Sequence, residues 1–123
     1  MSGFLFAGTD TTSHFLQIAV YEIARNPEVE QKVREEIDKF MSTNDYSYEN
    51  LKNLTYIDNV QKETLRVYGP SIFLFWREAA KDNLLGEIPI RKGSLISVVW
   101  LANHLSEKYF IEPNKFRPER WEK

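Results

Sequence analysis

Three short groups of residues in this sequence carry side chains that could do chemistry. In the first, an acid, Asp10, stands directly before a hydroxyl, Thr11. An acid beside a hydroxyl can relay protons at a point where a helix backbone opens. The second is Glu63 with Arg66, three residues apart and therefore on one face of a helix. The third is Arg120, a cation from the far end of the chain.

The first group has a plain structural interpretation beside the chemical one. Phe4 to Ala7 could form a strand, with Gly8 in a turn and Asp10 as the N-cap of the next helix. If the helix is instead continuous, Ala7 and Gly8 let a flat ligand approach the backbone. Thr11 would then bond back to the carbonyl of residue 7. Both interpretations stay open at this point.

Glu63 and Arg66 also allow two interpretations. As an exposed ion pair they would add only a few tenths of a kcal/mol to stability. However, they flank the apolar stripe of their helix instead of opposing it, which indicates the edge of a buried surface. A carboxylate there needs a partner. Arg120 is the candidate partner from elsewhere in the chain.

Composition limits the class of protein. The 123 residues make about one domain, and 28% charged with 42% hydrophobic residues is typical of a globular chain. A net charge of −2 gives no electrostatic reason to expect nucleic-acid binding. The absence of cysteine excludes disulfides, thiolate metal ligands and a cysteine nucleophile within this chain. No apolar run reaches the ~18 residues of a membrane span, so we expect no membrane segment here.

Hydrophobic residues at helical spacing predict helices over 4–24, 27–41 and 55–68. In the first helix, one stripe is expected to face the core: Leu16, Ala19, Val20 and Ile23. In the second, three acid–base pairs are expected on a solvated face: Glu28/Lys32, Glu30/Arg34 and Glu35/Lys39.

Local signals bound the shorter elements. Thr55 with Asp58 resembles a capping box that opens the third helix. Gly69 followed by Pro70 ends it, because glycine accepts a left-handed conformation and proline cannot continue the helix. Ser47 is expected to cap a short turn.

After the third helix the pattern changes to short extended runs. Residues 72–76, 88–90 and 95–100 predict the strands of a small sheet. Pro113 and Pro118 argue against regular structure at Pro113 and in 116–121. We therefore expect a predominantly α fold with a small β-sheet. The chain should form a single piece over 1–123, with a helical part at 1–70, a sheet part at 71–100, and a short helix and Pro-Glu-Arg loop at 101–123.

The order and spacing of these motifs resemble the cytochrome P-450 family of haem-thiolate monooxygenases. The motifs are Ala-Gly-x-Asp-Thr-Thr, Glu-x-x-Arg and Phe-x-Pro-Glu-Arg, and the resemblance extends from about Phe4 to Trp121. It implies a partial cytochrome P-450 fold, the C-terminal half without the cysteine-bearing haem loop. Local departures include Gly69 where proline is common, a longer loop at 89–93, and Trp121 in place of phenylalanine.

By this resemblance, Asp10 and Thr11 match the acid and alcohol that deliver protons during dioxygen cleavage. They are the expected catalytic residues. Ala7, Gly8 and Arg77 match cofactor-binding positions, and Arg77 would reach a haem propionate.

The resemblance also implies a structural network and a substrate pocket. The network that would hold the loop behind the haem comprises Glu63, Arg66 and Arg120. The residues expected to line the substrate pocket are Phe4, Ile72, Phe73 and Leu74, and their apolar side chains imply an apolar substrate.

No residue of this chain is expected to bind metal, because the family's iron ligand is a cysteine. His14 and His104 remain, but a lone histidine is more often a surface or capping residue. The implied cofactor of the full-length protein is haem. The implied partners are an apolar small-molecule substrate, dioxygen and an electron-donating reductase, and no nucleic acid. The same resemblance places the full-length protein at the endoplasmic reticulum membrane.

The implied function of the full-length protein is insertion of one atom of dioxygen into an apolar organic substrate. We expect this chain to be an internal fragment that is inactive alone, because the cysteine ligand is missing. A non-catalytic helical interaction domain is the main alternative, with the three motifs as surface ion pairs and caps. An α/β nucleotide-binding module would need a strand before Gly8 and the fingerprint glycines, which are absent.

Overall fold

A computed structural model describes residues 2–70 and 76–122. Its helices are α1 (Ser2–Arg25), α2 (Pro27–Ser42), α3 (Tyr48–Leu51), α4 (Thr55–Tyr68), α5 (Trp100–His104) and the 3₁₀ helix η1 (Pro118–Trp121). Its strands are β1 (Arg77–Glu78), β2 (Asn83–Leu85), β3 (Ile88–Ile90) and β4 (Leu95–Ile96). The expected predominantly α fold with a small β component is confirmed.

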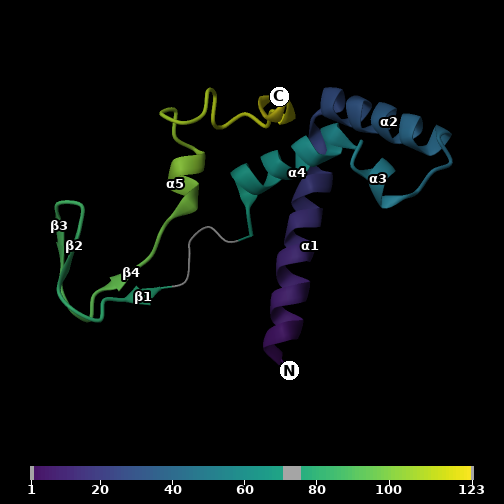
Figure 1. Ribbon diagram of the computed structural model, residues 1–123. Coiled ribbons are helices and arrows are strands. Elements are labelled where there is room, and N and C mark those ends of the chain that lie inside the picture. Colours follow the sequence, from purple (N-terminus) through teal and green to yellow (C-terminus); the bar gives the residue numbers. More distant parts are fainter. Residues whose placement is uncertain (1, 71–75, 123) are drawn as a thin grey trace.

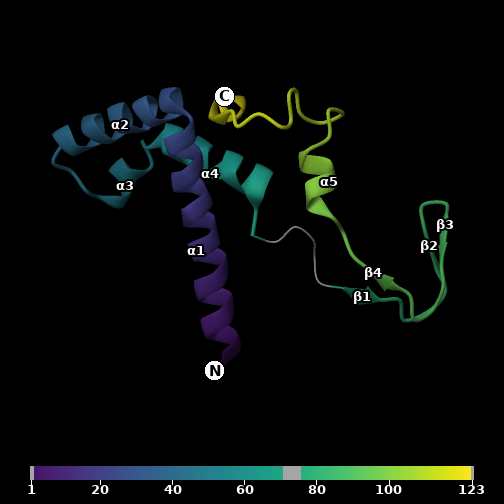
Figure 2. The same cartoon turned by 180° about the vertical axis from the view of Figure 1, so that it is seen from behind.

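Three helices form the centre of the fold, and the strands lie to one side. In Figures 1 and 2, α2 and α4 gather at the C-terminal end of α1, and the C-terminal η1 lies beside α4. The N-terminal half of α1 extends away from the other elements in both views. The strands β1 to β4 lie on the far side of α5 from α1. The packed part of the molecule is therefore the region around α4.

α1 runs without a break through Gly8 and Asp10, so the strand-and-turn interpretation of residues 4–10 is wrong. The predicted core stripe of α1 is wrong in part. Ala19 is buried, but Leu16 and Val20 are 54% and 66% exposed. The face of α1 that packs on its neighbours carries Ala19 and Glu22, so Leu16 and Val20 lie on a side of the helix that is left largely exposed.

The apolar core is small. It consists of Val29 and Val33 of α2 with Val60 of α4, and partly buried side chains pack around it: Ile23, Tyr56, Ile57 and Phe116. Phe116 brings the C-terminal segment onto the helices. The core therefore joins residues from both ends of the sequence.

The start of α4 is capped by a residue of α2, and the predicted capping box is wrong. Leu54 is the N-cap residue and makes no side-chain capping bond. The carboxylate of Glu36 instead accepts hydrogen bonds from the backbone N–H groups of Tyr56 and Ile57, both at 2.8 Å. Asp58 pairs with Lys62 at 2.6 Å. A charge from a neighbouring helix thus satisfies the orphan donors of the first turn.

The end of α4 also differs from the prediction. Gly69 has φ −49° and ψ 140°, which is extended and not left-handed. The residue before a proline is driven out of the helical region, which explains this conformation. Glycine still matters, because a Cβ on residue 69 would stand 2.7 Å from the carbonyl oxygen of Leu65. α4 therefore ends by steric restriction from Pro70.

The strands form two antiparallel pairs, β1 with β4 and β2 with β3, instead of one small sheet. The β2–β3 hairpin turns at Gly86, which has a positive φ of 61°. The strand expected over 95–100 ends at Ile96, and Trp100 begins α5. The strand expected over 72–76 falls mostly outside the described residues.

The segment 118–121 forms a short 3₁₀ helix although it begins with a proline. Pro118 occupies the first turn, where the N–H that proline lacks needs no partner. The expectation of irregular structure there is wrong for this reason. Among the helices of the described ranges, none is long and apolar enough to cross a membrane.

We expect Glu36→Ala to lower the free energy of unfolding by about 1 kcal/mol, because the first-turn donors of α4 lose their acceptor. Urea unfolding followed by far-UV circular dichroism measures the effect. Glu35→Ala is the matched control, since that exposed carboxylate accepts a hydrogen bond from the side chain of Gln31 on its own helix. Equal stability of the two variants would contradict the capping role of Glu36.

Candidate functional site

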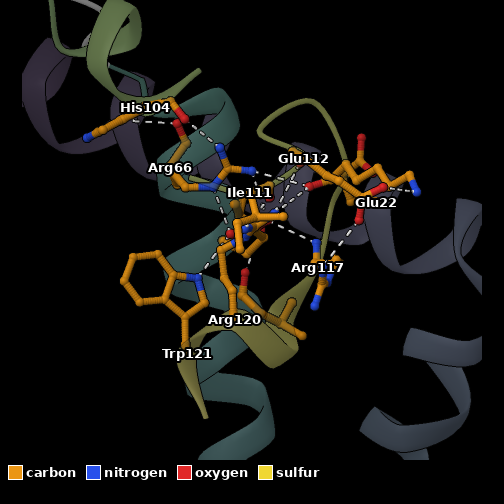
Figure 3. Close-up of polar contacts among 12 residues, drawn as sticks. Glu22, Arg66, His104, Ile111, Glu112, Arg117, Arg120 and Trp121 are labelled. Carbon is orange, nitrogen blue, oxygen red and sulfur yellow. Dashed lines mark hydrogen bonds and ion pairs between the residues drawn. The ribbon is translucent and has the colours of Figure 1, made fainter. Parts of the chain in front are cut away.

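The carboxylate of Glu63 on α4 is the centre of a dense polar cluster. One oxygen, Oε1, accepts three bonds, each at 2.9 Å: from Arg66 Nη2, the Arg117 backbone N–H and Arg120 Nε. The other, Oε2, accepts two: from Arg66 Nε at 2.9 Å and Trp121 Nε1 at 3.0 Å. Figure 3 shows Arg66, Arg120 and Trp121 converging at this point. Five donors thus surround one carboxylate.

The two guanidinium groups use their remaining donors on backbone carbonyls. Arg66 Nη1 donates to the carbonyl of His104 at 2.6 Å, and Nη2 reaches that of Lys115 at 3.3 Å. Arg120 Nη1 donates to the carbonyl of Ile111 at 2.9 Å. The two arginines therefore fix the path of the chain between α5 and η1, a stretch with almost no regular structure.

Burial makes this cluster energetically demanding. Glu63 is 0% exposed and Arg66 is 3% exposed. Among the described residues, no buried side-chain nitrogen or oxygen lacks a hydrogen-bond partner. A buried charge is tolerated when it is paired and fully bonded, and it becomes costly when one partner is lost. Surface placement, which the interaction-domain alternative expects, does not describe this pair.

The protonation of Glu63 follows from the same contacts. Burial by itself raises the pKa of Glu63, but hydrogen bonds from Arg66, the Arg117 backbone and Arg120 outweigh it and hold the pKa below its usual range. A carboxyl with a lowered folded-state pKa stabilises the fold above its unfolded-state pKa. That contribution is lost as the pH falls through the folded-state pKa.

Two members of the cluster were not found by sequence reasoning. The spacing indicated Glu63, Arg66 and Arg120, and the structure brings all three together. The Arg117 backbone N–H carries no sequence signal. Trp121 does carry one, because an indole has an N–H donor that the phenylalanine common at this position lacks.

A second carboxylate fixes η1 to the helices. Glu119 Oε1 accepts bonds from Lys32 Nζ of α2 at 2.6 Å and from the Tyr56 hydroxyl of α4 at 2.8 Å. Burial, and to a lesser extent the hydrogen bond with Glu119, raises the pKa of Tyr56, so its hydroxyl stays protonated as a donor. Lys32 was expected to pair with Glu28 on a solvated face, and this is wrong because Glu119 lies within reach. The Arg34–Glu30 pair does form, at 2.7 Å.

The predicted proton-relay residues lie on the unpacked half of α1. The Thr11 hydroxyl donates to the carbonyl of Ala7 at 2.7 Å, as expected for a continuous helix. Asp10, Thr11, Ala7 and Gly8 are all exposed, and a Cβ added to Gly8 would meet nothing within 4 Å. This face is therefore open to the approach of a flat ligand.

The other predicted site residues are not brought to the Glu63 cluster. Phe4 is 91% exposed near the start of α1. Arg77 is exposed on β1, which lies apart from α1 in both views. Ile72, Phe73 and Leu74 lie outside the described residues.

An apolar pocket of about 630 Å³ opens between α1, the end of α4 and α5. His14 and Ile18 of α1 line it with Tyr68, Trp100 and His104. Across the described ranges, no group of three or more histidine, cysteine or acidic residues could hold a metal ion. The largely apolar lining of this pocket suits the flat face of a haem, and the chain contains no cysteine that could supply a thiolate ligand.

Comparison with known proteins defines the class of protein. The family described as Cytochrome P450 matches residues 1–123. Cytochrome P450 4V2 of Mus musculus is 40% identical over 120 residues, covering 96% of this chain and 23% of that protein. Cytochrome P450 3A5 of Homo sapiens is 39% identical over 121 residues, covering 98% of this chain and 24% of that protein.

A solved structure agrees. A zebrafish cytochrome P450, described in a structure with progesterone, superposes with a TM-score of 0.89 at 26% identity. The match covers 98% of this chain and 29% of that chain. This chain belongs to the cytochrome P450 family, and it spans about a quarter of the length of the curated relatives it matches.

We expect Glu63→Gln to lower the free energy of unfolding by at least about 3 kcal/mol, because two buried guanidinium groups lose their countercharge. Chemical denaturation at neutral pH measures the loss, and a chain that no longer folds is the extreme of the same result. Glu49→Gln, which removes an exposed ion pair with Lys52, is the control and should leave stability unchanged. A Glu63→Gln effect as small as that of the control would mean that the cluster is not buried in solution.

Proposed function

We propose that the protein containing this chain is a haem monooxygenase that inserts one atom of dioxygen into an apolar organic substrate, with electrons from a reductase. The observation that carries the proposal is the buried Glu63 cluster in a chain of the cytochrome P450 family. When bound, the haem supplies the iron at which dioxygen is reduced. The residues of this chain hold the scaffold and move protons.

Asp10 and Thr11 are the proposed proton relay. The Thr11 hydroxyl donates to the Ala7 carbonyl, so its oxygen lone pairs remain available to accept a proton from water or from the protonated form of Asp10. Rotation of the hydroxyl away from Ala7 then directs its proton outward from the helix. A relay placed on one helix turn delivers protons at a defined point.

Glu63, Arg66 and Arg120 have a supporting role in this proposal. They lie on α4 and η1, whereas the relay lies on α1. The network holds the segment between α5 and η1 through backbone carbonyls. We propose that this rigid segment supports the haem-binding part of the whole protein, with Arg77 toward a propionate and Phe4 with residues 72–74 toward the substrate.

The proposal also covers the activity of this chain by itself and the location of the whole protein. Because the 123 residues include no cysteine, we propose that they are inactive by themselves as a monooxygenase. Placement of the whole protein at the endoplasmic reticulum membrane stays a prediction from the resemblance.

In the whole protein, we expect Thr11→Val to lower the rate of product formation by at least about tenfold while electron consumption continues. Valine keeps the shape of threonine without the hydroxyl, so reduced oxygen should leave as hydrogen peroxide. Product and peroxide measured per electron pair consumed give the result.

Two further variants make the Thr11 test specific. Thr11→Ser keeps a hydroxyl and should retain most product formation. Thr12→Val removes the neighbouring exposed hydroxyl and should leave the ratio of product to peroxide unchanged. Full product yield from Thr11→Val would exclude the relay.

We expect the 123-residue chain mixed with haem, then reduced and exposed to carbon monoxide, to lack the Soret band typical of thiolate ligation. The reason is that no thiolate is present. Absorption spectroscopy makes the measurement, with a bacterial or other intact cytochrome P450 as the positive control. A thiolate-type band from this chain would contradict the proposal.

A further inference from the structure

The end of α4 has a carbonyl that its own helix cannot satisfy. In an α-helix, the carbonyl of residue 66 would accept the N–H of residue 70. Residue 70 is proline and has no N–H, and Gly69 before it is extended. The Arg66 carbonyl therefore needs a donor from elsewhere.

His104 at the end of α5 lies in the position of that donor. Its Nδ1 is 3.1 Å from the Arg66 carbonyl oxygen. A carbonyl oxygen can only accept, so this contact requires a proton on Nδ1. Figure 3 shows the other ring nitrogen directed away from Arg66.

The side chain of Arg66 makes a second hydrogen bond to His104. Arg66 Nη1 donates to the His104 carbonyl at 2.6 Å, so the two residues, 38 positions apart, exchange two hydrogen bonds. The His104 ring also meets the Phe110 ring edge to face, with centroids 6.4 Å apart. The centroid of the Phe110 ring in turn lies 5.1 Å from Arg66 Cζ and 5.9 Å from Arg120 Cζ. His104 thus supports the guanidinium groups both directly and through one aromatic ring.

We propose that His104 is a positioning residue for the Glu63 cluster: its Nδ1–H replaces the N–H missing at Pro70 and fixes the Arg66 backbone from which the guanidinium extends. This role goes beyond the proposed function, because it concerns contacts within this chain and holds whether or not the whole protein is a monooxygenase.

Two amide variants of the full chain distinguish hydrogen bonding from simple packing. Asparagine places its Nδ2 donor near the Nδ1 position of histidine, whereas glutamine places its amide farther out, near Nε2. We expect the unfolding equilibrium constant to rise by at least about tenfold for His104→Gln, since a half-buried carbonyl loses its donor. The rise for His104→Asn should be much smaller.

A role in packing alone predicts the opposite order, because glutamine fills more of the histidine volume than asparagine does. His104→Gln equal to or more stable than His104→Asn would therefore overturn the proposal. Equal destabilisation by both variants would overturn it as well.

A spectroscopic measurement on the unsubstituted chain keeps the proposal testable if a variant fails to fold. Nitrogen-15 chemical shifts of the His104 ring, at a pH where the ring is neutral, report which nitrogen carries the proton. We expect a protonated Nδ1 and an unprotonated Nε2, with His14 as the internal comparison. The reverse tautomer at His104 would exclude the bond to Arg66 and overturn the proposal.

Discussion

The burial of one carboxylate determines how the C-terminal segment meets α4. Glu63 is removed from water, and a lone ionised carboxyl there would be prohibitively unstable. Its stability requires Arg66 from the same helix and three donors from residues 117–121. The apolar core, with three valines, is too small to fix the C-terminal segment by itself. Polar contacts therefore do here what side-chain packing does in a larger core.

Sequence reasoning found the elements whose signals are local. The spacing of Glu63 and Arg66 on one helix face, together with a cation at Arg120, was sufficient to predict their meeting. The helix over 27–41 has strong apolar spacing, and α2 matches it within a residue at its C-terminal end. These patterns depend on residues three or four positions apart, which a sequence displays directly.

What the sequence could not display were the donors and acceptors supplied by distant segments. Glu36 caps α4, which begins 19 positions later. Lys32 bonds Glu119 instead of its neighbour Glu28. In both cases a partner from a distant segment takes the place of the neighbour that the local pattern predicts. The predicted core stripe on α1 was wrong in part for a different reason: hydrophobic spacing identifies an apolar face but not what covers it. The proton-relay geometry at Thr11 is local, and the predicted back-bond is present.

The separation of the partners along the chain also affects the order of folding. Glu63 and its C-terminal donors are 54 to 58 positions apart, so their contacts have high contact order. During synthesis, α4 emerges from the ribosome before residues 117–121 exist, and its acid and arginine remain hydrated until then. Desolvation of the pair is consequently a late event, which follows the synthesis of residues 117–121.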